Sequence, residues 1–175
     1  MNKTILIGGI LLIIVITAVV MKSGQKSGGS ASSASQTDIN ACAILTPETA
    51  ATALGTDVEL STAPNTDMKI KNITVSSCTY SSKNPPTPRD IAIVSLLIRR
   101  ATDVKEAKVI FDTSRQTFKG VDVAMQGVDE AFWTDSLQQL NLLKGRDWLM
   151  ITTGKMGAKT QEQAVQTANL ILPKL

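Results

Sequence analysis

The sequence predicts an α+β domain with a mainly antiparallel β-sheet and two or three packed helices, preceded by an N-terminal transmembrane helix and a flexible linker. An uncharged apolar run opens the chain, and a stretch rich in Ser and Gly follows it. The remaining residues then change between helical and strand-like hydrophobic periods, in the order helix, strands, helix, strands, helix. We therefore divide the chain into a membrane anchor (1–21), a linker (22–37) and one extracytoplasmic domain (38–175).

The anchor is predicted from Thr4–Met21, eighteen consecutive residues without a charge. At about 1.5 Å per residue this run spans about 27 Å as a helix, close to the roughly 30 Å hydrocarbon core of a bilayer. A cleaved secretory signal is the alternative, but it requires a shorter apolar core followed closely by a small-x-small site. The nearest small residues in that arrangement lie further on, around Ser30–Ser35. We expect an uncleaved single-pass anchor.

The side of the membrane on which the domain lies is inferred from its cysteines. Lys3 precedes the apolar run while Lys22 and Lys26 follow it, so the distribution of basic residues does not support export. The cysteine argument below favours an extracytoplasmic domain, and a cytoplasm-facing membrane adaptor remains the alternative. Residues 22–37 contain only Lys, Ser, Gly, Gln, Ala and Thr, a composition typical of a flexible tether.

Charge and composition exclude several classes of function for the domain. Of eighteen basic residues, Lys3, Lys22 and Lys26 precede Asp38, which leaves fifteen basic against fifteen acidic side chains and a net charge of zero. This balance argues against nucleic acid as a partner. The sequence contains no His, which excludes imidazole-based catalysis and His-ligated zinc. Arg99-Arg100, the one basic pair, is expected to form the solvated end of a strand.

Cys42 and Cys78 are the two cysteines of the chain. Two thiolates cannot complete a tetrahedral zinc site, and their separation is not that of a C-x-x-C redox motif. An even number of cysteines in a small exported domain favours a disulfide. Two buried free thiols in a cytoplasmic domain are the alternative.

The first part of the domain is predicted to contain one helix and three strand regions. Thr46 is a candidate N-cap, and Pro47 and Glu48 suit the first helical turn, which Gly55 would follow at the helix end. The predicted strands are Asp57–Leu60, Met68–Ser76 and the apolar central strand Ile91–Leu97. The second is broken in phase by a bulge or turn at Lys71-Asn72 and is extended by Cys78 and Tyr80. The Pro-rich turn Ser82–Pro88 leads to the third.

The second part is predicted to contain two helices with strands between them. Residues 103–118 have a helical apolar spacing, and Thr160 with Gln163 forms a capping box for a last helix that ends at Pro173. Its apolar stripe, which includes Ala164 and Ala168, is expected to face the core. The strands between the helices are predicted at Val121–Ala124, Leu137–Leu143 and Trp148–Thr153, the last two joined by a Gly-containing turn at 144–147.

Four acidic residues are the candidates for chemistry: Asp129, Glu130, Asp135 and Asp147. Paired carboxylates can bind a divalent cation or hydrolyse a glycan, so a carboxylate-dependent envelope hydrolase is an alternative function. Adjacent residues on a strand point to opposite faces, however, which opposes a shared site for Asp129 and Glu130. We expect solvated turns here, and we predict no catalytic, cofactor-binding or metal-binding residues.

Three segments together resemble a known kind of domain: Cys42–Gly55, Cys78–Tyr80 and Gly127–Trp133. They are similar to small exported bacterial lipoprotein-like domains of unknown function, which combine a C-x-L-L-T-x-x-E helix, a C-x-Y strand and a G-x-x-D-E-A turn. The layout is more distantly similar to the PsbP-like α+β sandwich. The resemblance implies a fold and a disulfide but no reaction. This chain lacks the lipidated Cys of those lipoproteins, which favours anchoring by a helix.

The function expected from these observations is binding rather than catalysis. We expect a membrane-anchored extracytoplasmic domain, in the periplasm or at the cell surface, whose partner is a protein or another envelope component.

Overall fold

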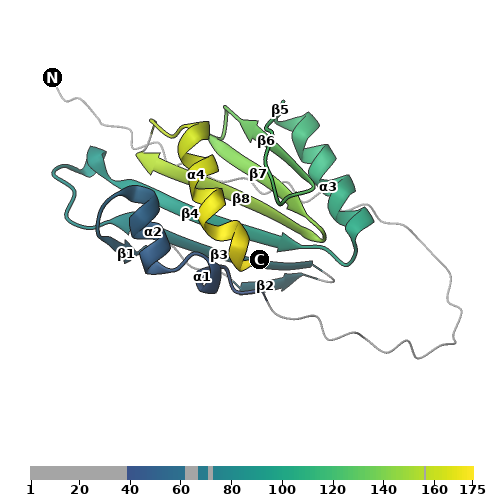
Figure 1. Ribbon diagram of the computed structural model, residues 1–175, viewed down its shortest axis with the longest axis horizontal. Helices are drawn as coiled ribbons and strands as arrows, with labels where there is room; N and C mark the ends of the chain where they lie inside the picture. The colour runs from purple at the N-terminus through teal and green to yellow at the C-terminus, as the bar shows by residue number, and fades with distance from the viewer. Residues whose placement is uncertain (1–38, 62–66, 71–72, 156) are drawn as a thin grey trace, which may run out of the picture. The chain divides into compact units, whose positions relative to one another are not determined.

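The computed structural model describes residues 39–61, 67–70, 73–155 and 157–175, and Figure 1 shows the arrangement of their elements. The predicted anchor (1–21) and linker (22–37) lie outside the described residues. Among those described, no helix is long and apolar enough to cross a membrane. The helices are α1 (Ala41–Ile44), α2 (Pro47–Leu54), α3 (Val104–Thr117) and α4 (Gln161–Ile171), with 3₁₀ turns at Pro88–Asp90 and Leu172–Lys174.

Eight antiparallel strands form one sheet. They are β1 (Val58–Leu60), β2 (Asp67–Ile70), β3 (Ile73–Ser82), β4 (Ala92–Arg100), β5 (Val121–Asp122), β6 (Glu130–Thr134), β7 (Gln139–Lys144) and β8 (Asp147–Lys155). Their spatial order is β1-β3-β4-β8-β7-β6-β5. Strand β2 also pairs with β3, at residues 73–76, whereas β1 pairs with residues 80–82 of that strand. The predicted α+β class with an antiparallel sheet is therefore confirmed.

Local sequence signals locate several helix boundaries correctly. Thr46 Oγ1 accepts a hydrogen bond from Thr49 N at 3.3 Å, and Gly55 ends α2 in the left-handed conformation with φ of 66°. The predicted capping box of α4 is also present: Thr160 Oγ1 accepts from Gln163 N at 3.2 Å, and Gln163 Oε1 accepts from Thr160 N at 3.3 Å.

Other elements differ from the prediction. The described part of the chain contains four α-helices because a single-turn helix, α1, precedes α2. The region extending from Met68 is two antiparallel strands, β2 and β3, which agrees with the break in phase predicted at Lys71-Asn72. Residues 71–72 themselves lie outside the described residues. Residues 130–134 form strand β6, which was not predicted; a solvated turn was expected at Asp129-Glu130.

The main core lies between the sheet and the helices α1, α2 and α4. Figure 1 shows α2 and α4 crossing one face of the sheet. Side chains that point to this face are buried, for example Val94, Leu96 and Ile98 of β4 at 0%, 1% and 0% exposure. Ala164, Ala168 and Ile171 of α4 pack against them, which confirms the predicted apolar stripe. Apolar surface buried in this cluster stabilises the fold by about 25 cal/mol per Å².

Candidate binding surface

The two faces of the sheet are covered to different extents. Because side chains alternate along a strand, residues next to the main core point to the opposite face. On that face only α3 packs, through a second small cluster in which Phe111 contacts Phe132 and Trp148 with ring centroids 4.8 Å and 6.4 Å apart. Leu143 of β7 completes this contact, so α3 covers the part of the sheet formed by β6, β7 and the start of β8.

The remainder of this face is partly exposed, and we call it the open face. It runs over β3, β4 and β8, and no helix in the described part of the chain packs across it. The paired strand positions 77, 97 and 150, and 79, 95 and 152, form adjacent rows on it. Its partly exposed residues are Val75, Ser77, Thr79, Ser81, Ile93, Ser95, Leu97, Arg99, Met150 and Thr152.

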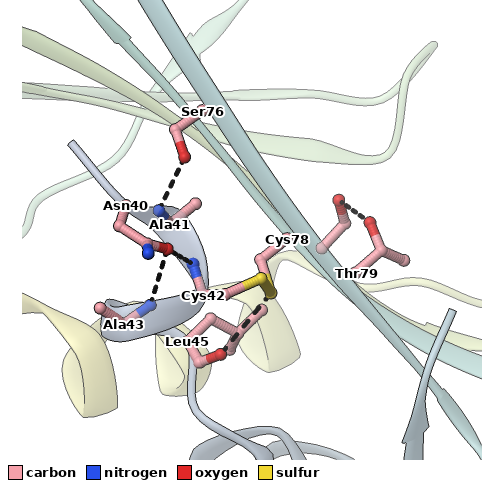
Figure 2. Close-up of a disulfide and its surroundings, with 9 residues drawn as sticks. Asn40, Ala41, Cys42, Ala43, Leu45, Ser76, Cys78 and Thr79 are labelled. Atoms are coloured by element: carbon pink, nitrogen blue, oxygen red, sulfur yellow. Dashed lines mark hydrogen bonds between the residues drawn. A yellow bond between two sulfur atoms is a disulfide. The ribbon is translucent and has the colours of Figure 1, made fainter. Parts of the chain in front are cut away.

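The open face combines aliphatic and hydroxyl side chains on a firmly held sheet. Thr79 and Ser95 hydroxyls are hydrogen bonded across β3 and β4 at 3.0 Å. Figure 2 shows Thr79 on the side of β3 opposite to Cys78. Cys78 is fully buried against the main core, directly behind the open face. The strands of the open face are thus fixed from behind by close packing.

The disulfide predicted between Cys42 and Cys78 is present, with the Cα atoms 5.0 Å apart (Figure 2). It joins α1 to the middle of β3. Asn40 Oδ1 accepts hydrogen bonds from Cys42 N and Ala43 N, and Ala41 N donates to Ser76 Oγ at 2.8 Å. This set of contacts holds the start of the domain against the back of the strand that carries the open face.

Arg99 is the one charged residue among the open-face residues named above. It lies between Val75 and Trp148 in the strand register, and its guanidinium carbon is 6.0 Å from the centroid of the Trp148 ring. Together with Ala101, Ala107 and Ile110, these two residues line a shallow crevice where the sheet meets α3. Burial lowers the pKa of Arg99, and the negative charge of Glu106 on α3 partly opposes that effect.

Arg99 lacks the partners that its neighbour has. Its Nε atom is buried and has no hydrogen-bond acceptor among the described residues. Arg100, on the other side of β4, forms two 2.7 Å hydrogen bonds to the carboxylate of Asp147. The expectation of a solvated strand end at Arg99-Arg100 is therefore wrong: β4 lies between β3 and β8, and the side chains of both arginines are partly buried.

The four acidic candidates are each held by a different group. Asp129 Oδ2 accepts from Gly145 N at 2.6 Å, and Asp135 accepts from Trp133 Nε1 at 2.5 Å. Glu130 forms ion pairs with Lys108 at 2.8 Å and Arg115 at 3.6 Å. Asp147 is bound by Arg100 as described above. Asp147 and Glu130 are thus strand residues in ion pairs, where solvated turn positions were expected.

Metal-binding geometry is not seen in the described residues, where no group of three or more Cys, Asp or Glu side chains is placed to hold an ion. A separate open hollow lies between the β5–β6 connection and α4, lined by Asp122, Glu162 and their neighbours. Asp122 is already paired with Arg115 at 2.9 Å.

The open face was not predicted from the sequence, although a signal for it exists. Ile91–Leu97 reads as an apolar strand buried on both sides. Read at every second position, however, β4 presents Ile93, Ser95, Leu97 and Arg99 on one face. That is the mixed pattern of a strand with one accessible face.

Comparison with family models, with curated proteins and with solved structures finds no match for this chain.

Proposed function

We propose that this protein is a membrane-anchored, extracytoplasmic binding module, and that a segment of a partner protein docks on the open face of its sheet. The observation that carries the proposal is the uneven cover of the sheet, in which three helices pack on one face while α3 covers part of the other. A surface of aliphatic and hydroxyl side chains on fixed strands suits docking, because a rigid surface loses little conformational entropy on binding.

The anchor and the compartment are supported by separate observations. The uncharged length of Thr4–Met21 suits a single membrane span. The Cys42–Cys78 disulfide is typical of proteins in oxidising compartments, which favours a domain outside the cytoplasm over a cytoplasm-facing adaptor. The Ser/Gly-rich composition of residues 22–37 suits a tether that keeps the domain clear of the lipid headgroups.

A non-catalytic role agrees with how the acids are used. A carboxylate-dependent hydrolase needs two carboxylates that converge on one substrate. Here Asp147 is bound by Arg100, Glu130 is bound by Lys108, and Asp129 accepts from a backbone amide in the β7–β8 turn. These roles account for the acids without substrate chemistry.

Site-specific photo-crosslinking of the full chain in its native membrane tests the proposal. A benzoylphenylalanine at Ser95 or Leu97 reports on the open face, and one at the exposed Val109 of α3 is the control. We expect both open-face positions to form the same crosslinked species, with the partner peptide mapped by mass spectrometry. A Leu97→Asp change should abolish the crosslink made from Ser95.

Two results would refute the docking surface: equal crosslinking from Val109, or a Ser95 crosslink that survives Leu97→Asp in folded protein. Circular dichroism and thiol alkylation confirm that each variant is folded and disulfide-bonded.

A further inference from the structure

Resting on the proposed function, we propose that the segment docked on the open face is a single amphipathic helix, which lies beside α3 and places a carboxylate on Arg99.

The space beside α3 accommodates one further helix. α3 packs over β7 and β8 through Phe111, which contacts Trp148. Packed helices have axes about 8–10 Å apart, and two strand spacings are about 9–10 Å. A helix lying next to α3 would therefore run over β4 and β3, the two strands that carry most of the open face. Ile110, on the flank of α3 that lines the crevice with Arg99, would form one side of the contact.

The charge at the crevice is positive and incompletely compensated. The half-buried Arg100 and Arg115 each form ion pairs with carboxylates. Arg99 forms no ion pair among the described residues, and Glu106 acts on it only through a longer-range attraction. A buried polar atom without a partner costs free energy, and more so on a charged group. An incoming carboxylate would supply the charged partner that this guanidinium lacks among the described residues.

The chemistry of the crevice favours a carboxylate on an apolar segment. The planar edge of a guanidinium matches the two oxygens of a carboxylate, and the Trp148 ring already fixes its plane. An anionic lipid surface would require several basic side chains together, and the open face contributes one. Leu97, Ile93 and Met150 offer aliphatic contacts to the apolar side of a helix. The structure thus assigns Arg99 as the anchor of an acidic amphipathic helix.

A random 15-residue peptide phage library, selected on the immobilised full chain, tests this assignment. Selected peptides should combine one Asp or Glu with apolar residues at helical spacing, and Leu97→Asp should abolish their binding. Leu97→Ser, a smaller change, replaces that variant if it does not fold. For the strongest peptide, synthesised with a fluorophore, Arg99→Gln should raise Kd about 30-fold or more, because it leaves a buried carboxylate unpaired. Lys105→Gln on the exposed side of α3 is the matched control and should leave Kd unchanged.

A charge exchange makes the test specific to the ion pair. Arg99→Glu should abolish binding of the acidic peptide, and replacing the peptide's acid with Lys should restore binding to that variant. Arg99→Lys should recover only part of the affinity, because an ammonium lacks the planar edge of the guanidinium.

The outcomes separate this inference from the proposed function. Binding that Leu97→Asp abolishes but Arg99→Gln leaves unchanged would overturn the acidic helix while the open face stands as a docking surface. Failure to select any peptide sensitive to Leu97→Asp would overturn both. A wild-type dimer that Leu97→Asp converts to a monomer in light scattering would also overturn the inference, because a second copy would then occupy the face.

Discussion

Two ion pairs, one at each end of β8, differ in how far their side chains are buried. The Arg100–Asp147 pair joins the last residue of β4 to the first residue of β8, with side-chain exposures of 19% and 15%. The Lys155–Asp90 pair joins the other end of β8 to the 3₁₀ turn Pro88–Asp90 and is more exposed, at 55% and 35%. Since both are ion pairs to the same strand, they form a matched comparison of burial.

Asp147→Asn should lower the free energy of unfolding by about 1–3 kcal/mol, because it leaves a partly buried guanidinium without its charged partner. Asp90→Asn should lower the free energy of unfolding much less than Asp147→Asn does, because solvent screens an exposed ion pair. Urea denaturation followed by tryptophan fluorescence measures both. Equal losses in the two variants would contradict the role assigned to burial.

Gly120 is a second position where one atom matters. It follows α3, and a Cβ placed there would collide with the ring of Phe132, which is fully buried. Gly120→Ala should therefore destabilise the domain by about 1–3 kcal/mol through overpacking.

The matched test for Gly120 is Phe132→Leu combined with Gly120→Ala. If the collision is the cause, the loss in thermal stability of the double variant should be smaller than the sum of the two single losses. Strictly additive losses would indicate a different origin.

Among the elements, α1 depends most on tertiary contacts. One turn of helix is too short to be stable alone. It is held by the disulfide to β3, by the bond from Ala41 N to Ser76 Oγ, and by Lys174 Nζ, which donates to the Ile44 carbonyl oxygen at 3.2 Å. The two ends of the described chain, residues 39–45 and 172–174, thus meet on the same face of the sheet.

Replacing both cysteines, as Cys42→Ala with Cys78→Ala, should lower the free energy of unfolding by about 4 kcal/mol, since the bridge closes a loop with a sequence separation of 36 residues. Urea denaturation of the wild type with and without reductant provides the control, and the reduced wild type should match the double variant. Stability that is unchanged on reduction would show that helix packing alone holds α1 in place.

For the whole molecule, the proposed topology is a helix in the membrane, a tether and one domain outside the cytoplasm. We expect mass spectrometry of membrane-extracted protein to recover residues before Lys22, and added protease to reach the domain in spheroplasts without lysis. A soluble form that begins between Ser30 and Gln36 would establish cleaved export. A domain digested only after lysis would establish the cytoplasm-facing adaptor.

The sequence alone determined those features that depend on neighbours along the chain. Thr46 with Pro47 and Gly55 defines α2, and Thr160 with Gln163 defines the start of α4, because capping is a hydrogen-bonding preference within one turn. The class of the fold followed from hydrophobic periods in the same way. The pairing of Cys42 with Cys78 followed because no other cysteine is available.

Only the tertiary structure decided which surfaces are covered and which charges meet. Strand β6 was not predicted because its five residues, Glu130–Thr134, carry no local signal that distinguishes a short strand from a turn. They form a strand because they pair with β5 and β7. The fates of Arg99 and Arg100 differ because adjacent strand residues point to opposite faces. Arg100 is bonded to Asp147, which is 47 residues further along the chain. Arg99 instead lies between α3 and the uncovered part of the sheet. Such differences arise from long-range packing, which is why the candidate binding surface appeared only in three dimensions.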